Sequence, residues 1–104
     1  MTRRAAGGVR YLAAAAQDYK AQLRYYAAAM PGLESTFAKA VERTERLAIG
    51  NPTGFARIRD TDGARAVVVR RFPFRMIYVI RGDVVVVVSL AHTSRSFEAL
   101  LKRR

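Results

Sequence analysis

The sequence contains no cysteine and no tryptophan, and only one histidine among 104 residues. Without cysteine, the chain can form neither a disulfide bond nor a thiolate metal site. A single histidine cannot build a histidine-rich metal centre either, so we expect neither a metal nor another cofactor. The absence of cysteine is also typical of proteins in a reducing compartment, and we therefore expect a cytoplasmic location.

Acidic residues are scarce as well. Eight Asp and Glu stand against 19 Lys and Arg, which gives a formal net charge of +11. Such a surplus favours an acidic or polyanionic partner, for example nucleic acid or an acidic protein. Because 11 of the basic residues lie in the second half of the chain, from Phe55 onward, we expect the basic surface to concentrate there.

Long apolar runs are also missing. No segment approaches the roughly 20 apolar residues that a membrane-spanning helix needs. Gly7, Gly8 and Arg10 interrupt the N-terminal apolar stretch, so we expect neither a signal peptide nor membrane association. Hydrophobic residues nevertheless make up 51% of the chain, which is enough for one folded domain over residues 1–104, with residues 1–8 flexible.

Hydrophobic periodicity predicts the secondary structure. A short strand at Val9–Leu12 is followed by two amphipathic helices, at about 13–30 and from Leu33 to the stop at Gly50. Three strands then follow, at Ala66–Phe72, Phe74–Arg81 and Val84–His92, and a short helix is expected at Phe97–Arg104.

These elements predict an α+β fold. An N-terminal strand and an antiparallel helical hairpin pack on a mainly antiparallel sheet in the order β-α-α-β-β-β, followed by a short C-terminal helix or tail. Both faces of the long strands are apolar. We therefore expect the helical hairpin to cover one face, and the C-terminal segment, a partner, or both to cover the other.

The dipeptide Gly82-Asp83 predicts a two-residue turn between the last two strands. Directly opposed residues share a face of a sheet. The predicted pairs on one face are Arg81 with Val84, Val79 with Val86, Ile77 with Val88, and Arg75 with Leu90. This register places Arg75 and His92 on the same face.

No catalytic sequence motif is present: the chain has no P-loop, no GxGxxG, no HExxH and no nucleophile elbow. His92, at a strand end, is a candidate general acid or base, or else a residue that bonds to neighbouring backbone. Arg75 with Arg71 can bind a phosphate or stabilise charge in a transition state. The alternative for Arg75 is an ion pair with Asp83, Glu98 or an acidic partner.

The segment RRFPFRMIYVI-RGD-VVVVVSLAHTSR, from Arg70 to Arg95, resembles the RelE/ParE toxin superfamily of type II toxin–antitoxin systems. Members often carry an Arg-Phe-Pro-Tyr-Arg-like segment, a hydrophobic hairpin, and Ala-His followed by Arg. The likeness extends from Val9 to Arg95, because YLAAAAQDYKAQLRYYAAAMPGL is similar to the family's first helix and its break. The resemblance implies a small basic toxin that a cognate acidic antitoxin holds inactive in a hetero-oligomer.

The two branches of this superfamily imply different targets. RelE-like members cleave messenger RNA on the ribosome, and for that activity the resemblance implies Arg75, His92 and Arg95 as catalytic residues. Residues 67–69 are valines where RNA-cleaving members tend to place lysines, and no Tyr or His follows Phe97. ParE-like members block DNA gyrase without known hydrolytic chemistry, and the segment RFPFR with the Ala-His ending is closer to them.

We therefore favour growth inhibition through DNA gyrase, by binding and without catalysis. A ribosome-dependent mRNA interferase is the alternative, and a nucleic-acid-binding module or a degenerate non-toxic member are further ones. The residues selected for binding the target or the antitoxin are basic side chains at the hairpin ends, with two aromatic residues and one leucine. They are Arg70, Arg71, Arg75, Arg81, Tyr26, Phe97 and Leu100.

Overall fold

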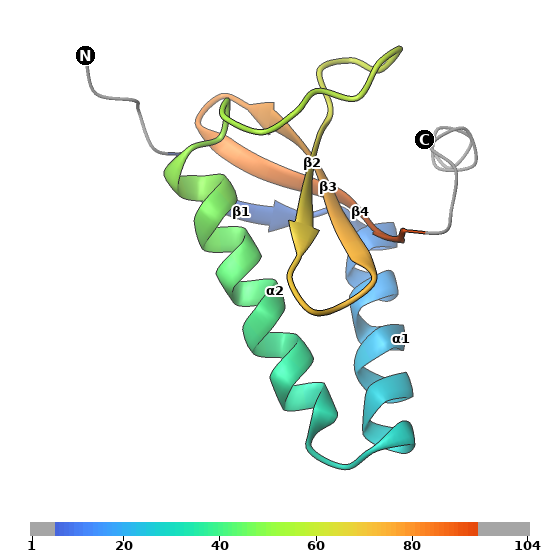
Figure 1. Ribbon diagram of the computed structural model, residues 1–104. Coiled ribbons are helices and arrows are strands. Elements are labelled where there is room, and N and C mark those ends of the chain that lie inside the picture. The colour runs from blue at the N-terminus through green and yellow to red at the C-terminus, as the bar shows by residue number, and fades with distance from the viewer. Residues whose placement is uncertain (1–5, 94–104) are drawn as a thin grey trace.

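The computed structural model describes residues 6–93. They form β1 (Gly8–Tyr11), α1 (Ala13–Ala29), α2 (Leu33–Gly50), β2 (Arg65–Val69), β3 (Phe74–Arg81) and β4 (Val84–His92) (Figure 1). This order confirms the predicted α+β fold. The helix predicted at Phe97–Arg104 lies outside the described residues. Neither described helix is long and apolar enough to cross a membrane.

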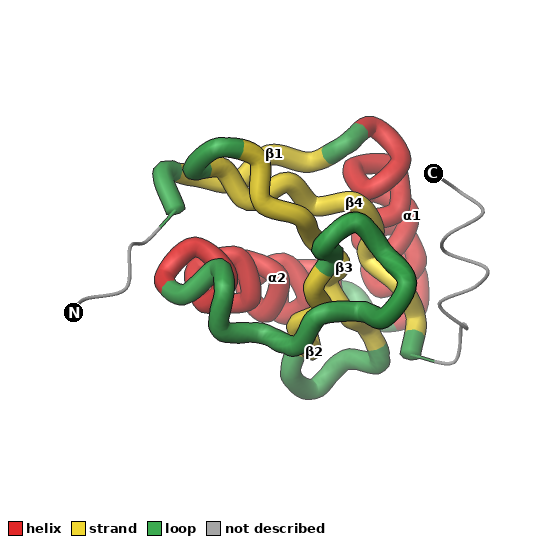
Figure 2. Tube along the Cα trace, turned by 90° about the horizontal axis from the view of Figure 1, so that it is seen from above, coloured by secondary structure: helices red, strands yellow, loops and turns green. Residues whose placement is uncertain are grey.

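The strands form one four-stranded sheet in the order β1-β4-β3-β2. β1 pairs in parallel with β4, and the other neighbours are antiparallel. Figure 2 shows the strands crossing above the two helices. The chain is already held ahead of β1, because the backbone N–H groups of Ala6 and Gly7 donate to the carbonyl oxygens of Ile49 and Asp83. The predicted flexibility of residues 1–8 stays a prediction.

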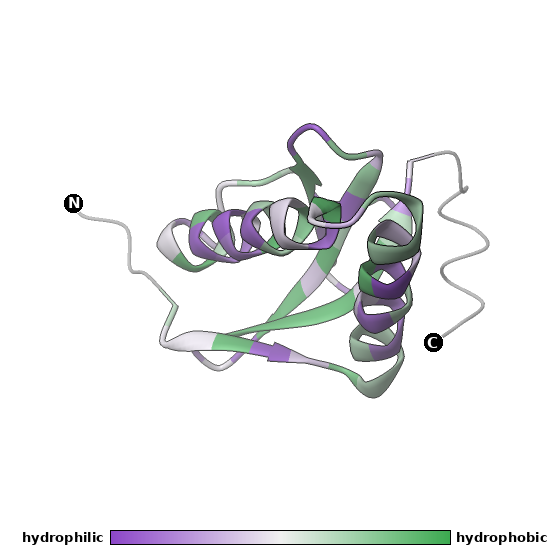
Figure 3. Cartoon of the chain, turned by 90° about the horizontal axis from the view of Figure 1, so that it is seen from below, coloured by the Kyte–Doolittle hydropathy of each residue, from purple (hydrophilic) through white to green (hydrophobic). Residues whose placement is uncertain are grey.

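The helical hairpin covers one face of the sheet (Figure 1). α2 presents Phe37, Val41, Thr44 and Ala48, spaced by three or four residues, and all four are buried. Thr44 is accommodated there because its hydroxyl donates to the carbonyl oxygen of Ala40, at 2.8 Å. Figure 3 shows the middle of the long strands as hydrophobic and both helices as alternately hydrophilic and hydrophobic, as expected of elements with one buried face.

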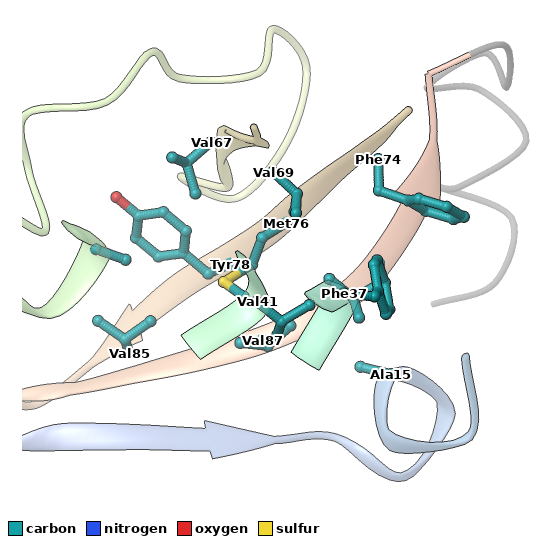
Figure 4. Packing of buried hydrophobic residues seen from close by; sticks show 12 residues of the cluster. Ala15, Phe37, Val41, Val67, Val69, Phe74, Met76, Tyr78, Val85 and Val87 are labelled. Carbon is teal, nitrogen blue, oxygen red and sulfur yellow. The ribbon is translucent and has the colours of Figure 1, made fainter. Parts of the chain in front are cut away.

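The core between the helices and the sheet is built from large side chains of β3 and small ones of the neighbouring strands. Tyr78 and Met76 are fully buried beside Val85 and Val87 of β4 (Figure 4). The Tyr78 hydroxyl donates to the carbonyl oxygen of Pro52 at 2.6 Å, which satisfies two buried polar groups. This bond fastens the start of the segment between α2 and β2 to the sheet.

That segment, residues 51–64, also contributes to the cover of the second sheet face. Ile58 and Ala64 pack with Ile77, Val79 and other buried residues of β3 and β4. The Nη1 group of Arg65 donates to the carbonyl oxygens of Thr53 and Phe55, at 3.1 and 2.7 Å. The second face is thus covered in part by the segment between α2 and β2, whereas the sequence predicts a cover by the C-terminal segment or a partner. The predicted cover by the C-terminal segment concerns residues outside the described range.

The β3–β4 register corrects the prediction. The pairs from Arg81–Val84 to Tyr78–Val87 are as predicted, but the register then shifts by one residue between Ile77 and Tyr78. Beyond the shift, Arg75 lies opposite Ala91 instead of Leu90, and Ile77 lies opposite Ser89 instead of Val88. The physical reason is a β-bulge in β4, which adds one residue to that strand. Each later residue of β4 therefore lies on the sheet face opposite to the predicted one.

Because of this bulge, the prediction that Arg75 and His92 share a face is wrong. His92 lies opposite Phe74, and their rings meet edge to face with centroids 5.3 Å apart on the helix side of the sheet. Arg75 lies opposite Ala91, which packs in the cluster on the other side. The two side chains therefore point to opposite faces of the hairpin.

Candidate functional site: a basic groove between α2 and the β2–β3 turn

A groove of about 340 Å³ opens between α2 and the turn that joins β2 to β3. We call it the basic groove. Its lining residues are Thr36, Lys39, Ala40, Arg43, Thr44, Arg46, Leu47, Val68, Arg70, Arg71 and Phe72. Five of these 11 residues are cationic and none is acidic.

One wall of the basic groove is a basic side of α2. Lys39, Arg43 and Arg46 follow one another at spacings of four and three residues, so they lie on the same side of the helix. None of the three glutamates of α2 belongs to the groove lining, and two of them have hydrogen-bond partners elsewhere. Glu45 accepts a hydrogen bond from the Tyr11 hydroxyl of β1 at 2.5 Å, and Glu34 accepts one from the backbone N–H of Gly32 at 2.6 Å. The helix thus keeps its acidic groups out of the groove.

The Tyr11–Glu45 contact is partly buried. Burial raises the pKa of Tyr11 far above its ordinary value, and the hydrogen bond to Glu45 raises it further. The phenol therefore stays protonated throughout the physiological range and serves as a permanent donor. Its role is to fasten β1 to the acidic side of α2.

The other wall is the β2–β3 turn. The backbone N–H of Phe72 donates to the carbonyl oxygen of Val69 at 3.2 Å, and Arg71 has a φ of 71°. A positive φ at the third residue, Arg71, after a negative φ at the second, Arg70, is typical of a type II turn, whose third position prefers glycine. This turn also ends β2 at Val69, whereas the alternation of the sequence predicts a strand as far as Phe72.

Phe72 fixes the turn against the helical hairpin. Its ring centroid lies 5.0 Å from that of Phe37 on α2 and 5.3 Å from that of Tyr26 on α1. Figure 1 shows the turn between β2 and β3 reaching down between the two helices. Because Phe72 is anchored, the neighbouring Arg70 and Arg71 are held at the mouth of the groove.

The surface of the groove is partly apolar. Leu47 of α2 is 44% exposed and Val68 of β2 is 56% exposed, and both belong to the lining. Within residues 6–93, no hydrogen bond or ion pair engages the side chains of the five cationic residues. The groove therefore combines available positive charge with exposed apolar surface, which suits an acidic ligand with apolar parts.

Only two of the residues predicted from the sequence, Arg70 and Arg71, come together in this groove. Arg81 is exposed at the far end of β3, beside the turn to β4. Tyr26 is half-buried among the aromatic rings, where it contacts Phe37 and Phe72. The remaining predicted residues Arg95, Phe97 and Leu100 lie outside the described residues.

The basic residues of α2 are absent from the residues predicted from the sequence, which placed the basic surface in the second half of the chain. The spacing of Lys39, Arg43 and Arg46 along one helix side was a signal that could have revealed them. Nothing in the sequence indicated that this side of α2 faces Arg70 and Arg71, because that proximity arises from tertiary packing. Within the described residues, no cluster of His, Asp or Glu could hold a metal ion.

Comparison with known proteins identifies the family to which the chain belongs. The model of the family "ParE toxin of type II toxin-antitoxin system, parDE" matches residues 9–97. A solved structure described as "Chromosomal ParDE TA system from P. aeruginosa" has a similar fold, with a TM-score of 0.69 and 20% sequence identity over 82% of this chain and 94% of that one. No curated protein sequence matches significantly. The family match spans most of the chain and confirms the resemblance seen in the sequence. The chain belongs to the ParE toxin family of type II toxin–antitoxin systems.

Proposed function

We propose that this protein is a growth-inhibiting toxin which a cognate acidic antitoxin neutralises in a hetero-oligomeric complex, and which acts in the cytoplasm by binding DNA gyrase. The observation that carries the proposal is the basic groove, where five cationic side chains converge without a carboxylate. An acidic partner gains both contact energy and a faster encounter from such a surface, since opposite charges steer association.

Binding is favoured over catalysis because the candidate catalytic residues are separated. RNA cleavage needs a group that activates the 2′-hydroxyl and a cation that stabilises the same phosphate in the transition state. His92 packs on Phe74 on the helix side of the sheet, while Arg75 belongs to the opposite face. A single substrate phosphate would have to reach both faces of the hairpin.

Supercoiling assays with purified gyrase test the target. We expect the protein to inhibit supercoiling at micromolar concentration, and its induction in a bacterial host to arrest growth with DNA-damage signalling. Co-expression of a small acidic protein encoded beside this gene should restore growth. Unimpaired supercoiling together with ribosome-dependent cleavage of messenger RNA would establish the interferase alternative instead.

Substitution of the histidine separates the two mechanisms. His92→Phe keeps an aromatic ring against Phe74 but removes the titratable group. If the protein acts by binding, this variant should arrest growth as the wild type does. A ribonuclease that uses His92 as its general base would lose about 100-fold or more of its cleavage rate. The yield of folded protein, followed by circular dichroism, controls for misfolding.

A further inference from the structure

Exposed apolar groups and a strained arginine distinguish the basic groove from a general cationic surface. We propose that the groove binds an acidic peptide segment in which an apolar side chain lies between carboxylates, and that Arg71 is a specificity-determining residue for it. The inference rests on the proposed function for the source of this segment, the antitoxin. The physical basis for the groove's preference is independent of that source.

The apolar surface favours a peptide over a nucleic acid. Leu47 and Val68 are 44% and 56% exposed inside a groove that is otherwise rimmed by cations. The phosphate groups that would pair with the cations have no apolar surface to cover them, whereas a leucine or valine side chain of a peptide gains free energy from the contact. The volume of about 340 Å³ accommodates a few side chains and is at the low end of ordinary ligand pockets.

The positive charge of the groove determines where the ligand must carry carboxylates. The cations stand on both walls, with Lys39, Arg43 and Arg46 on α2 and Arg70 and Arg71 on the turn. Carboxylates on both sides of an apolar anchor would therefore each meet a cation. Guanidinium groups suit carboxylates because they can donate two parallel hydrogen bonds, and four of the five cationic residues are arginines.

Arg71 occupies a backbone conformation that an arginine adopts at a cost. Its φ of 71° lies in the left-handed region, at a turn position where glycine would be free of strain. Strained residues of this kind are found at functional sites, where the side chain is needed. Here the strained position directs a guanidinium to the mouth of the groove, beside Arg70. The side chain of Arg71 thus contributes to the groove at the expense of folding stability.

Two glycine variants test the strain. Arg71→Gly and Arg70→Gly each remove one cation from the same turn, but only position 71 has a positive φ. Arg71→Gly should leave the melting temperature unchanged or raise it by a few degrees. Arg70→Gly should lower it by about 4 °C, since glycine there only adds entropy to the unfolded chain. Equal losses in the two variants would overturn the assignment of strain to Arg71.

Fluorescence anisotropy with synthetic probes tests the ligand class. The probes are a peptide with glutamates on both sides of one leucine, a peptide of the same charge without leucine, and a single-stranded oligonucleotide of the same charge. The first should bind the full-length protein about tenfold more tightly than the other two. Binding of all three alike would overturn the peptide preference, and tighter binding of the oligonucleotide would assign the groove to nucleic acid.

The same assay tests Arg71. Arg71→Gly should weaken binding of the leucine-containing peptide about fivefold, while Arg24→Ala, which removes an exposed arginine of α1 outside the groove, should not change it. Unchanged affinity in Arg71→Gly would contradict the inference even if the protein inhibits gyrase. Conversely, selective peptide binding without gyrase inhibition would refute the proposed target and leave the groove's ligand class standing.

Discussion

At the scale of single residues, the fold depends on a few buried polar groups that have found partners. Tyr78 is an example: its ring fills the core, and its hydroxyl reaches the carbonyl oxygen of Pro52. Burial raises the pKa of this phenol, so it remains a donor. One residue thereby joins the centre of the sheet to the segment that follows α2.

The contribution of this hydrogen bond can be measured with Tyr78→Phe. The variant keeps the ring but leaves the buried carbonyl of Pro52 without its donor, and we expect a loss of about 1–2 kcal/mol in the free energy of unfolding. Urea denaturation followed by circular dichroism gives the value. Tyr25→Phe is the matched control, because Tyr25 is 64% exposed and should lose little. A similar loss of unfolding free energy in both variants would show that the buried hydrogen bond of Tyr78 does not contribute to stability.

At the scale of elements, α2 organises the molecule because its sides meet different neighbours. Phe37 on its buried side contacts the rings of Tyr26, Phe72 and Phe74, which belong to α1, the β2–β3 turn and β3. Its basic side forms a wall of the groove, and Glu45 holds β1. Packing of Phe37 therefore determines where the turn, with Arg70 and Arg71, stands relative to the helix.

Removal of the Phe37 ring should affect both stability and the groove. Phe37→Ala creates a cavity among the rings of Tyr19, Tyr26, Phe72 and Phe74, and we expect a loss of about 3–5 kcal/mol in the free energy of unfolding. Leu47→Ala on the same helix should cost less than about 1 kcal/mol, because that side chain is already 44% exposed. Denaturant titrations compare the two. If the two variants lost nearly the same free energy of unfolding, the aromatic rings around Phe37 would not be what holds the β2–β3 turn in place.

At the scale of the whole molecule, tyrosines tie the elements together and link folding to alkaline pH. Burial raises the pKa values of Tyr11, Tyr19, Tyr26 and Tyr78 above the ordinary value of 10.0. These residues connect β1, both helices and the sheet. Since the folded state disfavours tyrosinate, the unfolded chain loses its phenolic protons at lower pH than the folded one.

The pH dependence of stability follows from this difference. The stabilisation is fully present below pH 10, where the unfolded tyrosines keep their protons, and it is lost as pH rises from there towards the raised pKa values of the folded state. We expect the free energy of unfolding to decrease above pH 10, with a smaller decrease in Tyr11→Phe. Denaturant titrations at several alkaline pH values measure it. If the free energy of unfolding of Tyr11→Phe decreased with pH as steeply as that of the wild type, the contribution of Tyr11 to this pH dependence would be contradicted.

Local sequence patterns were sufficient to predict the order of the helices and strands and the resemblance to the toxin family. Apolar periodicity located both helices, and Gly82-Asp83 set the β3–β4 register as far as Tyr78, because these signals depend on residues close in the chain. The strand boundary at Phe72 was missed, since alternation continues through a turn in which Arg71 takes a conformation typical of glycine.

The composition of the candidate site, in contrast, depends on tertiary packing. The bulge in β4 moves His92 away from the face of Arg75, and a local pattern of apolar residues does not reveal one inserted residue. The packing of Phe72 between the helices brings Arg70 and Arg71 opposite Lys39 and its neighbours on α2. Such proximity between distant segments is a property of the packed core, and this is why sequence patterns alone identified the toxin family but not the basic groove.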